Sequence, residues 1–219
     1  MQKEFKITPS IMTCDVLAMR TEIKKLIKAG ITHIHFDLMD GHFVNNLGLS
    51  IENLISIKKE FPELVIDAHC MINNLEKLIE QICIADYITF HLDSQQSLTT
   101  KELIEKIKTS GCKVGLGIDL ATNLDQLDDL LSEVDLLTIM SIKPGFAGQE
   151  FEEKTWTTIK KIKQKIAKQN LKIKLQIDGG VRWSNINDLI AMKLDFIVVG
   201  SLLFKSSDYQ KTLNEIYKN

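Results

Sequence analysis

The sequence predicts an α/β protein: a single (β/α)8 barrel of the TIM type, formed by residues 1–219 as one domain. Eight short apolar runs, rich in β-branched residues, alternate along the chain with longer amphipathic segments. Each strand-plus-helix unit takes up about 27 residues, the size of a compact βα repeat. Right-handed crossovers between such units give a parallel sheet, which eight strands can close.

The predicted strands cover 5–10, 33–39, 64–71, 86–91, 113–118, 136–140, 173–178 and 196–200. Helical spacing of apolar residues predicts a helix in each connection, eight in all. Asp15 and Ser184 are the expected N-caps of two helices, and Gly30 and Gly111 are the expected C′ residues of two others.

An open, doubly wound sheet is the alternative fold. Its first strand is normally followed by a glycine-rich turn. Here the turn is Pro9-Ser10-Ile11-Met12, which contains no glycine. The absence of a Pro/Gly-rich linker or a low-complexity tract favours one domain.

Charge and composition exclude several classes of protein. Lys and Arg total 27 against 29 Asp and Glu, so nucleic acid is not an expected partner. No apolar stretch approaches the roughly 18 residues of a membrane span, and the N-terminus lacks a signal-peptide hydrophobic region. The four cysteines show no C-x-x-C spacing and are expected to be reduced, as in a cytoplasmic protein: Cys14, Cys70, Cys83 and Cys112.

Four acidic or imidazole side chains lie at the ends of predicted strands: His35, Asp37, His69 and Asp178. Strand alternation places His35 and Asp37 on one face, and the carboxyl ends of barrel strands converge on one mouth. A lone strand histidine is commonly a hydrogen-bonded core residue, but four convergent ionisable groups are costly to bury unless paired or metal-bound. This set predicts one divalent metal ion, with Zn, Fe(II), Mn and Co all suited to it.

Two carboxylates on opposite walls of the mouth predict acid–base chemistry. Asp37 and Asp178 could remove a proton from one face of a carbon and return one to the other face. The metal would act as a Lewis acid and stabilise an enediolate.

The remaining histidines and the strand-end methionines indicate a function less clearly. His33 is expected in the core, His91 beside the site without a carboxylate partner, and His42 at the rim. The methionines at strand ends are either gap-filling core residues or an apolar lining of the mouth: Met39, Met71 and Met140.

Glycines in the later loops predict phosphate binding, because barrel loops seven and eight commonly bind phosphate through backbone N–H groups. The pairs are Gly179-Gly180 and Gly200-Ser201. The loop 143–149 is a candidate lid, with Gly145 and Gly148 as hinges.

Several motifs along nearly the whole chain resemble those of the ribulose-phosphate 3-epimerase family. They are Pro9-Ser10-Ile11, the stretches 35–44, 67–71 and 140–149, Asp178-Gly179-Gly180 and Gly200-Ser201. The resemblance implies that His35, Asp37, His69 and Asp178 hold the metal. It also implies that Asp37 and Asp178 invert C3 of a ketose phosphate, most simply D-ribulose 5-phosphate to D-xylulose 5-phosphate. The implied substrate-binding residues are Ser10, Met39, His69, Met71, Met140, Gly145, Phe146, Ala147, Gly148, Gly179, Gly180, Gly200 and Ser201. Members of the family are usually homo-oligomers, either dimers or hexamers.

The sequence departs from the family pattern at several positions, including Gln176 in place of a usual glutamate and Lys143 before Pro144. Gln176 is expected to alter the charge around Asp178. The stretch 10–14 and Leu49-Ser50 resemble the related allulose-6-phosphate 3-epimerases, so a hexulose phosphate stays open as the substrate.

Two other functions are alternatives. A decarboxylase of the orotidylate or ketogulonate-phosphate type carries Asp-x-Lys-x-x-Asp on its third strand, and residues 67–72 lack that lysine and second acid. A non-catalytic barrel that binds a sugar phosphate would not need both Asp37 and Asp178.

Overall fold

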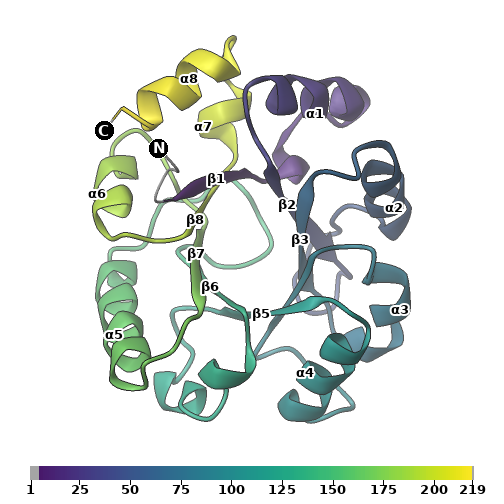
Figure 1. The fold of residues 1–219 in the computed structure, drawn as a ribbon, viewed down its shortest axis with the longest axis vertical. Helices are drawn as coiled ribbons and strands as arrows, with labels where there is room; N and C mark the ends of the chain where they lie inside the picture. The colour runs from purple at the N-terminus through teal and green to yellow at the C-terminus, as the bar shows by residue number, and fades with distance from the viewer. Residues whose placement is uncertain (1–4, 219) are drawn as a thin grey trace.

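The structure, a computed structural model, describes residues 5–218 and is a closed (β/α)8 barrel (Figure 1). The strands are β1 (Lys6–Pro9), β2 (His33–Met39), β3 (Val65–Met71), β4 (Tyr87–His91), β5 (Lys113–Ile118), β6 (Leu136–Met140), β7 (Lys174–Asp178) and β8 (Phe196–Val199). Each bound differs from the predicted one by at most one residue.

Every strand pair in the sheet is parallel, in the order β1-β8-β7-β6-β5-β4-β3-β2. A parallel bridge between Ser10 and His35 joins the end of β1 to β2 and closes the ring. The predicted TIM barrel is therefore confirmed.

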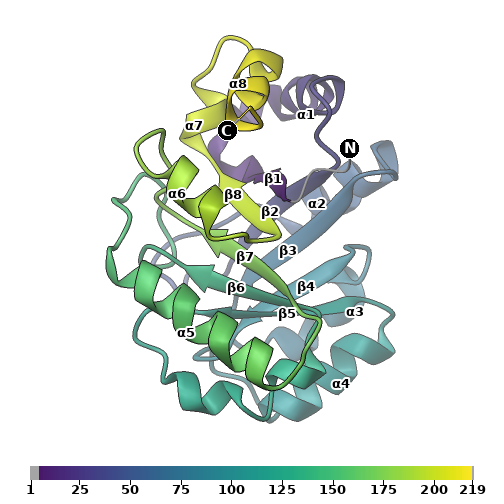
Figure 2. The same cartoon turned by 60° about the vertical axis from the view of Figure 1, so that its left-hand side comes forward.

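Helices surround the sheet, and Figure 2 shows α5 and α6 along the outside of the later strands. The α-helices are α1 (Met19–Lys28), α2 (Ile51–Glu60), α3 (Ile79–Ile82), α4 (Thr100–Thr109), α5 (Lys154–Lys168), α6 (Ile186–Ala191), α7 (Ser201–Phe204) and α8 (Tyr209–Ile216). The main core lies between these helices and the outer face of the sheet.

The helices are not distributed as predicted. Between β5 and β6 the described chain forms two 3-10 turns, Leu124–Leu127 and Leu131–Glu133, instead of an α-helix. The last unit carries two α-helices, α7 and α8. The connection begins with turns at 119–123, in which Asp119 Oδ1 accepts from the backbone N–H of Thr122 and Asn123 caps the first 3-10 turn.

Three of the four predicted helix signals hold. The Asp15 side chain accepts from Leu17 N and caps the 3-10 turn that precedes α1. Gly30 and Gly111 follow α1 and α4 with φ of +89° and +87°. Ser184 is not an N-cap, because α6 begins one residue later and Asn185, the residue before the helix, turns its side chain back to accept from Arg182 N.

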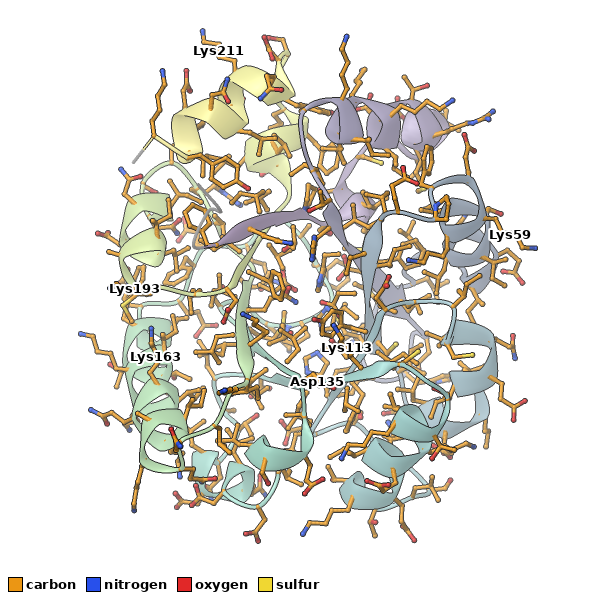
Figure 3. The ribbon with its side chains drawn as sticks, viewed as in Figure 1. Lys59, Lys113, Asp135, Lys163, Lys193 and Lys211 are labelled. Atoms are coloured by element: carbon orange, nitrogen blue, oxygen red, sulfur yellow. The ribbon has the colours of Figure 1, made fainter. Side chains whose placement is uncertain are left out.

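The barrel interior changes character along its axis. Tyr87, Leu136 and Phe196 form a buried apolar cluster near the amino-terminal ends of the strands. Above this cluster, toward the carboxyl ends, the inward side chains are mostly polar. In contrast, charged side chains such as Lys59 and Lys211 project outward from the helical layer (Figure 3).

All four cysteines are free. Cys70 belongs to the core outside the sheet, facing away from its neighbour His69 as strand alternation predicts. Within residues 5–218, no helix combines the length and apolarity that crossing a membrane requires.

Candidate active site

Two histidines and two aspartates meet inside the barrel at the carboxyl ends of three strands. His35 and Asp37 come from β2, His69 from β3 and Asp178 from β7. Their ligand-capable atoms all lie within 4.8 Å of one another. His35, Asp37 and His69 are buried, and Asp178 is partly exposed to the mouth. The structure thus brings together the four side chains singled out from the sequence.

The distances within this His–Asp cluster suit a small cation. His35 Nε2 lies 3.0 Å from His69 Nδ1 and 3.4 Å from one oxygen each of Asp37 and Asp178. His69 Nδ1 lies 3.2 Å and 3.5 Å from the same two oxygens. In a tetrahedral site with bonds of about 2.0–2.1 Å, ligand atoms are separated by roughly 3.3–3.4 Å. Both the donor set and its spacing therefore fit a divalent metal ion.

In each imidazole, the ring nitrogen that faces away from the cluster contacts a supporting side chain. His35 Nδ1 lies 3.0 Å from Asp67 Oδ2, and His69 Nε2 lies 2.8 Å from His91 Nε2. Asp67 can only accept when ionised, so the proton of His35 sits on Nδ1 and Nε2 faces the cluster. His91 touches the site through His69, in the supporting position expected of it.

Asp67 had no role in the sequence prediction. It lies two residues before His69 on the same inward face, which is the one signal that could have identified it. Burial would raise the pKa of Asp67, but hydrogen bonds from His35, Thr89 and Gln176 outweigh it and lower the pKa. Asp67 is therefore a buried anion that holds His35.

Opposite charges dominate the cluster. Burial would raise the pKa of Asp37, but the imidazoles of His35 and His69 hold it well below its usual range. Burial opposes a charge on His35, yet Asp37 and Asp178 raise its pKa well above the ordinary value. Burial, followed by repulsion from His69 and His35, lowers the pKa of His91 and keeps that ring neutral.

A cavity of about 620 Å³ opens above Asp37 and Asp178. This size suits a small-molecule ligand. It is lined by Ser10, Met39, Met71, Met140, Gly145, Phe146, Ala147, Gly148, Gly179, Gly180, Gly200 and Ser201. All were expected substrate contacts; His69, the remaining one, is fully buried and does not line the cavity.

Some lining residues were not predicted. Arg182 and Lys205 add two cations to the end of the cavity formed by the glycine loops. Met12, Ile142 and Val181 also line it. The position of Arg182 and Lys205 depends on the path of the loops after β7 and β8, which local sequence signals do not specify.

Glycine is required where the loop after β7 leaves the barrel. Gly179 and Gly180 have φ of +110° and +61°. A Cβ on Gly179 would lie 2.3 Å from Ile142 Cγ1, and one on Gly180 would lie 2.7 Å from the backbone of Phe151. These residues therefore allow the loop to pack tightly against the segment after β6.

The candidate lid, residues 143–149, is tied down at both ends. Gln149 Nε2 donates to the carbonyl oxygens of Lys143 and Phe146 within the loop. Asn46 Nδ2, from the loop after β2, donates to Gly145 O at 2.7 Å. The Arg182 guanidinium donates to Gln149 O at 3.3 Å. These hydrogen bonds hold the loop along one side of the cavity, where residues 145–148 contribute to its lining.

Three other residues singled out from the sequence, His33, His42 and Gln176, lie outside the His–Asp cluster. His33 lies away from the cluster, near the amino-terminal end of the barrel, and is half-buried against Phe196 instead of being fully in the core. His42 is exposed in the loop after β2. Gln176 contacts Asp67, His35 and Thr138, which lie deeper in the barrel than Asp178.

Fold and site together define a (β/α)8-barrel protein with a buried His–Asp cluster beneath a glycine-rimmed cavity. Residues 6–204 match the model of the ribulose-phosphate 3 epimerase family, and the chain belongs to this family. It is accordingly an isomerase of the epimerase class.

Curated relatives cover almost the whole chain. Ribulose-phosphate 3-epimerase of Escherichia coli K12 is 32% identical over 98% of this chain and 95% of its own. The enzyme of that name from Buchnera aphidicola (Acyrthosiphon pisum) is 36% identical over 98% of this chain and 94% of its own.

Solved structures with the same fold are more distant in sequence. 3-Hexulose-6-phosphate synthase from Salmonella typhimurium has a TM-score of 0.69 and 17% identity, covering 98% of this chain and 97% of that one. KGPDC from Streptococcus mutans has a TM-score of 0.70 and 12% identity, with the same coverage. At these identities the similarity shows the fold alone.

Proposed function

We propose that this protein interconverts D-ribulose 5-phosphate and D-xylulose 5-phosphate by inverting C3, with Asp37 and Asp178 as the two proton carriers. The observation that carries the proposal is that these two carboxylates, from β2 and β7, both line the cavity and have ligand-capable oxygens within 4.8 Å of each other. A carbon held there would present one face to each carboxylate. One carboxylate would accept the C3 proton while the other donates a proton to the opposite face, and the roles reverse in the other direction.

His35, Asp37, His69 and Asp178 would hold one divalent ion, with Zn, Fe(II), Mn and Co as candidates. When bound, such an ion supplies Lewis-acid stabilisation of negative charge on the substrate oxygens. The contacts of His35 Nδ1 with Asp67 and of His69 Nε2 with His91 support this role, because they leave the other nitrogen of each imidazole turned to the cluster.

The remaining lining would bind and shield the substrate. Ser10 Oγ donates to Asp37 Oδ2 at 2.6 Å and so orients that carboxylate. The three methionines, Met39, Met71 and Met140, place apolar groups around the reacting carbon and would keep water away from it. The loops at 145–148, 179–180 and 200–201 would hold the phosphate, with Arg182 and Lys205 as nearby positive charges.

Family membership supports ribulose 5-phosphate over allulose 6-phosphate as the substrate. We further propose one domain, a homo-oligomer (dimer or hexamer) and a cytoplasmic location, the last supported by four free thiols.

The test compares both substrates on one preparation. The protein is stripped with a chelator, reloaded separately with Zn, Fe(II), Mn or Co, and assayed with each ketose phosphate. We expect activity to return with metal and kcat/KM to favour ribulose 5-phosphate at least about tenfold. The reverse preference would assign the protein to the hexulose phosphate.

A further inference from the structure

A second set of polar side chains lies beneath and beside the His–Asp cluster. Asp67, Thr89, His91, Thr138 and Gln176 are all buried inside the barrel, each 5% exposed or less. Buried polar groups are costly unless they are hydrogen-bonded. Their contacts therefore show what this set is built to do.

Three donors converge on Asp67. Thr89 Oγ1 donates to Oδ1 at 2.5 Å, Gln176 Nε2 donates to Oδ2 at 2.6 Å, and His35 Nδ1 approaches the same Oδ2 at 3.0 Å. The carboxylate is thus held from three strands, β2, β4 and β7. Its orientation in turn sets the plane of the His35 ring, since a carboxylate accepts only along its lone pairs.

The Gln176 amide is itself oriented. Its Nε2 lies 3.1 Å from Thr138 Oγ1 as well as 2.6 Å from Asp67 Oδ2. A carboxylate oxygen only accepts, so the NH₂ group must face Asp67. Gln176 therefore acts as a donor with a fixed direction.

Strand β5 makes room for these side chains. Its inward positions beside Thr89 and His91 are Gly115 and Gly117. A Cβ on Gly115 would lie 2.0 Å from Thr89 Oγ1, and one on Gly117 would lie 3.1 Å from His91 Nε2. Glycine inside a strand is unfavourable and commonly marks a close approach. Here the close approach is that of the two side chains supporting the cluster.

We propose that Thr89 and Gln176 are positioning residues of the epimerase site: they fix Asp67 so that His35 presents Nε2 to the metal, and Gly115 leaves the space that Thr89 needs. The catalytic consequence rests on the proposed function. The effect on metal binding does not rest on the proposed function, because it follows from the geometry of His35 alone.

The test uses Co(II) as the probe, because its visible spectrum reports ligand geometry independently of turnover. Thr89→Val removes the hydroxyl at constant shape, and Gln176→Met removes the amide donor. Thr8→Val is the matched control, because Thr8 is also a buried barrel threonine but its Oγ1 has no hydrogen-bond partner among the described residues. Thr89→Ser is the conservative variant that keeps the donor.

Loss of a hydrogen bond behind a metal ligand typically weakens metal affinity 10–100-fold. Because Thr89 and Gln176 act on His35 through Asp67, we expect Thr89→Val and Gln176→Met to weaken Co(II) binding by up to about this factor. Both variants should alter the visible bands of Co(II), while Thr8→Val and Thr89→Ser stay close to wild type. Gly115→Ala should act in the same direction as Thr89→Val. Thermal unfolding of the metal-free variants identifies any loss of affinity that comes from misfolding.

Co(II) affinities and spectra of Thr89→Val and Gln176→Met equal to those of Thr8→Val would overturn the proposal, as would a wild-type protein that does not bind Co(II). A protein that binds Co(II) with these variant effects but leaves both ketose phosphates unchanged would overturn only the proposed function.

Discussion

His35 and His69 turn different ring nitrogens to the same point, and His35 Nε2 lies 3.0 Å from His69 Nδ1. The register of β2 against β3 explains the difference. His69 pairs with Asp37, whereas His35 pairs with Asp67, two residues deeper in the barrel. The deeper ring reaches the cluster with its far nitrogen and the shallower ring with its near one. Each then has its other nitrogen free for a supporting partner.

We expect Asp178→Asn to lower kcat by about 100- to 10,000-fold, because the amide cannot exchange a proton with C3. The protein should stay folded, since Asp178 lies at the open end of the cluster. Steady-state kinetics and a thermal melt check both statements. Asp188→Asn, an exposed change on α6, is the control; near-normal turnover in Asp178→Asn removes Asp178 from the proton path.

Asn46→Ala should loosen the lid by removing the hydrogen bond to Gly145 O. One such bond contributes about 1 kcal/mol, so KM for the substrate should rise about fivefold. The neighbouring Asn45 is exposed and makes a matched control. Equal KM values for Asn46→Ala and Asn45→Ala would show that this contact does not hold the lid.

Gly180→Ala should weaken substrate binding more than it weakens the fold. Its Cβ would lie 2.7 Å from the backbone of Phe151, so the loop must shift. Gly30→Ala provides the comparison, because Gly30 also has a positive φ but no atom within 4 Å of the added Cβ. Both variants carry the cost of about 1–2 kcal/mol for a side chain at positive φ. Gly180→Ala adds the cost of the contact with Phe151, and only this variant should raise KM. If Gly30→Ala raises KM as much, the phosphate assignment of this loop fails.

Thiol labelling should find one fast cysteine in the native protein. Burial, together with nearby Glu22, raises the pKa of Cys14 to about 11, so only about one in a thousand of its thiols is ionised at pH 8. Burial also raises the pKa of Cys70 and Cys112. Cys83 is half-exposed and should react first. Cys83→Ser should abolish the fast phase, and a fast phase that persists in this variant contradicts the assignment.

The strands were predictable because alternation and β-branched runs are local signals; β2, β5 and β6 match to the residue. The fifth connection was not, because side-chain caps such as that of Asn123 start 3-10 turns where the apolar spacing predicted an α-helix. The cap at Ser184 failed for a similar reason: the adjacent Asn185 side chain closes the turn instead.

The four residues of the His–Asp cluster could be found from the sequence because strand ends in a barrel share one mouth. The residues that orient this cluster could not be found from the sequence. The contact of Gln176 with Asp67, for example, joins residues 109 positions apart and depends on register across the barrel. Gln176 was expected to influence Asp178 only because strand alternation places both side chains on the same face of the strand. In the structure its amide contacts Asp67, His35 and Thr138.

The most direct measurement is solvent hydrogen exchange at C3. The metal-loaded protein is incubated with D-ribulose 5-phosphate in deuterated water, and the products are analysed by NMR. Deuterium should enter at C3 of xylulose 5-phosphate with inversion of that centre, and Asp37→Asn and Asp178→Asn should each block the inversion. Xylulose 5-phosphate without deuterium at C3, or deuterium confined to C1, would contradict proton transfer by these two carboxylates.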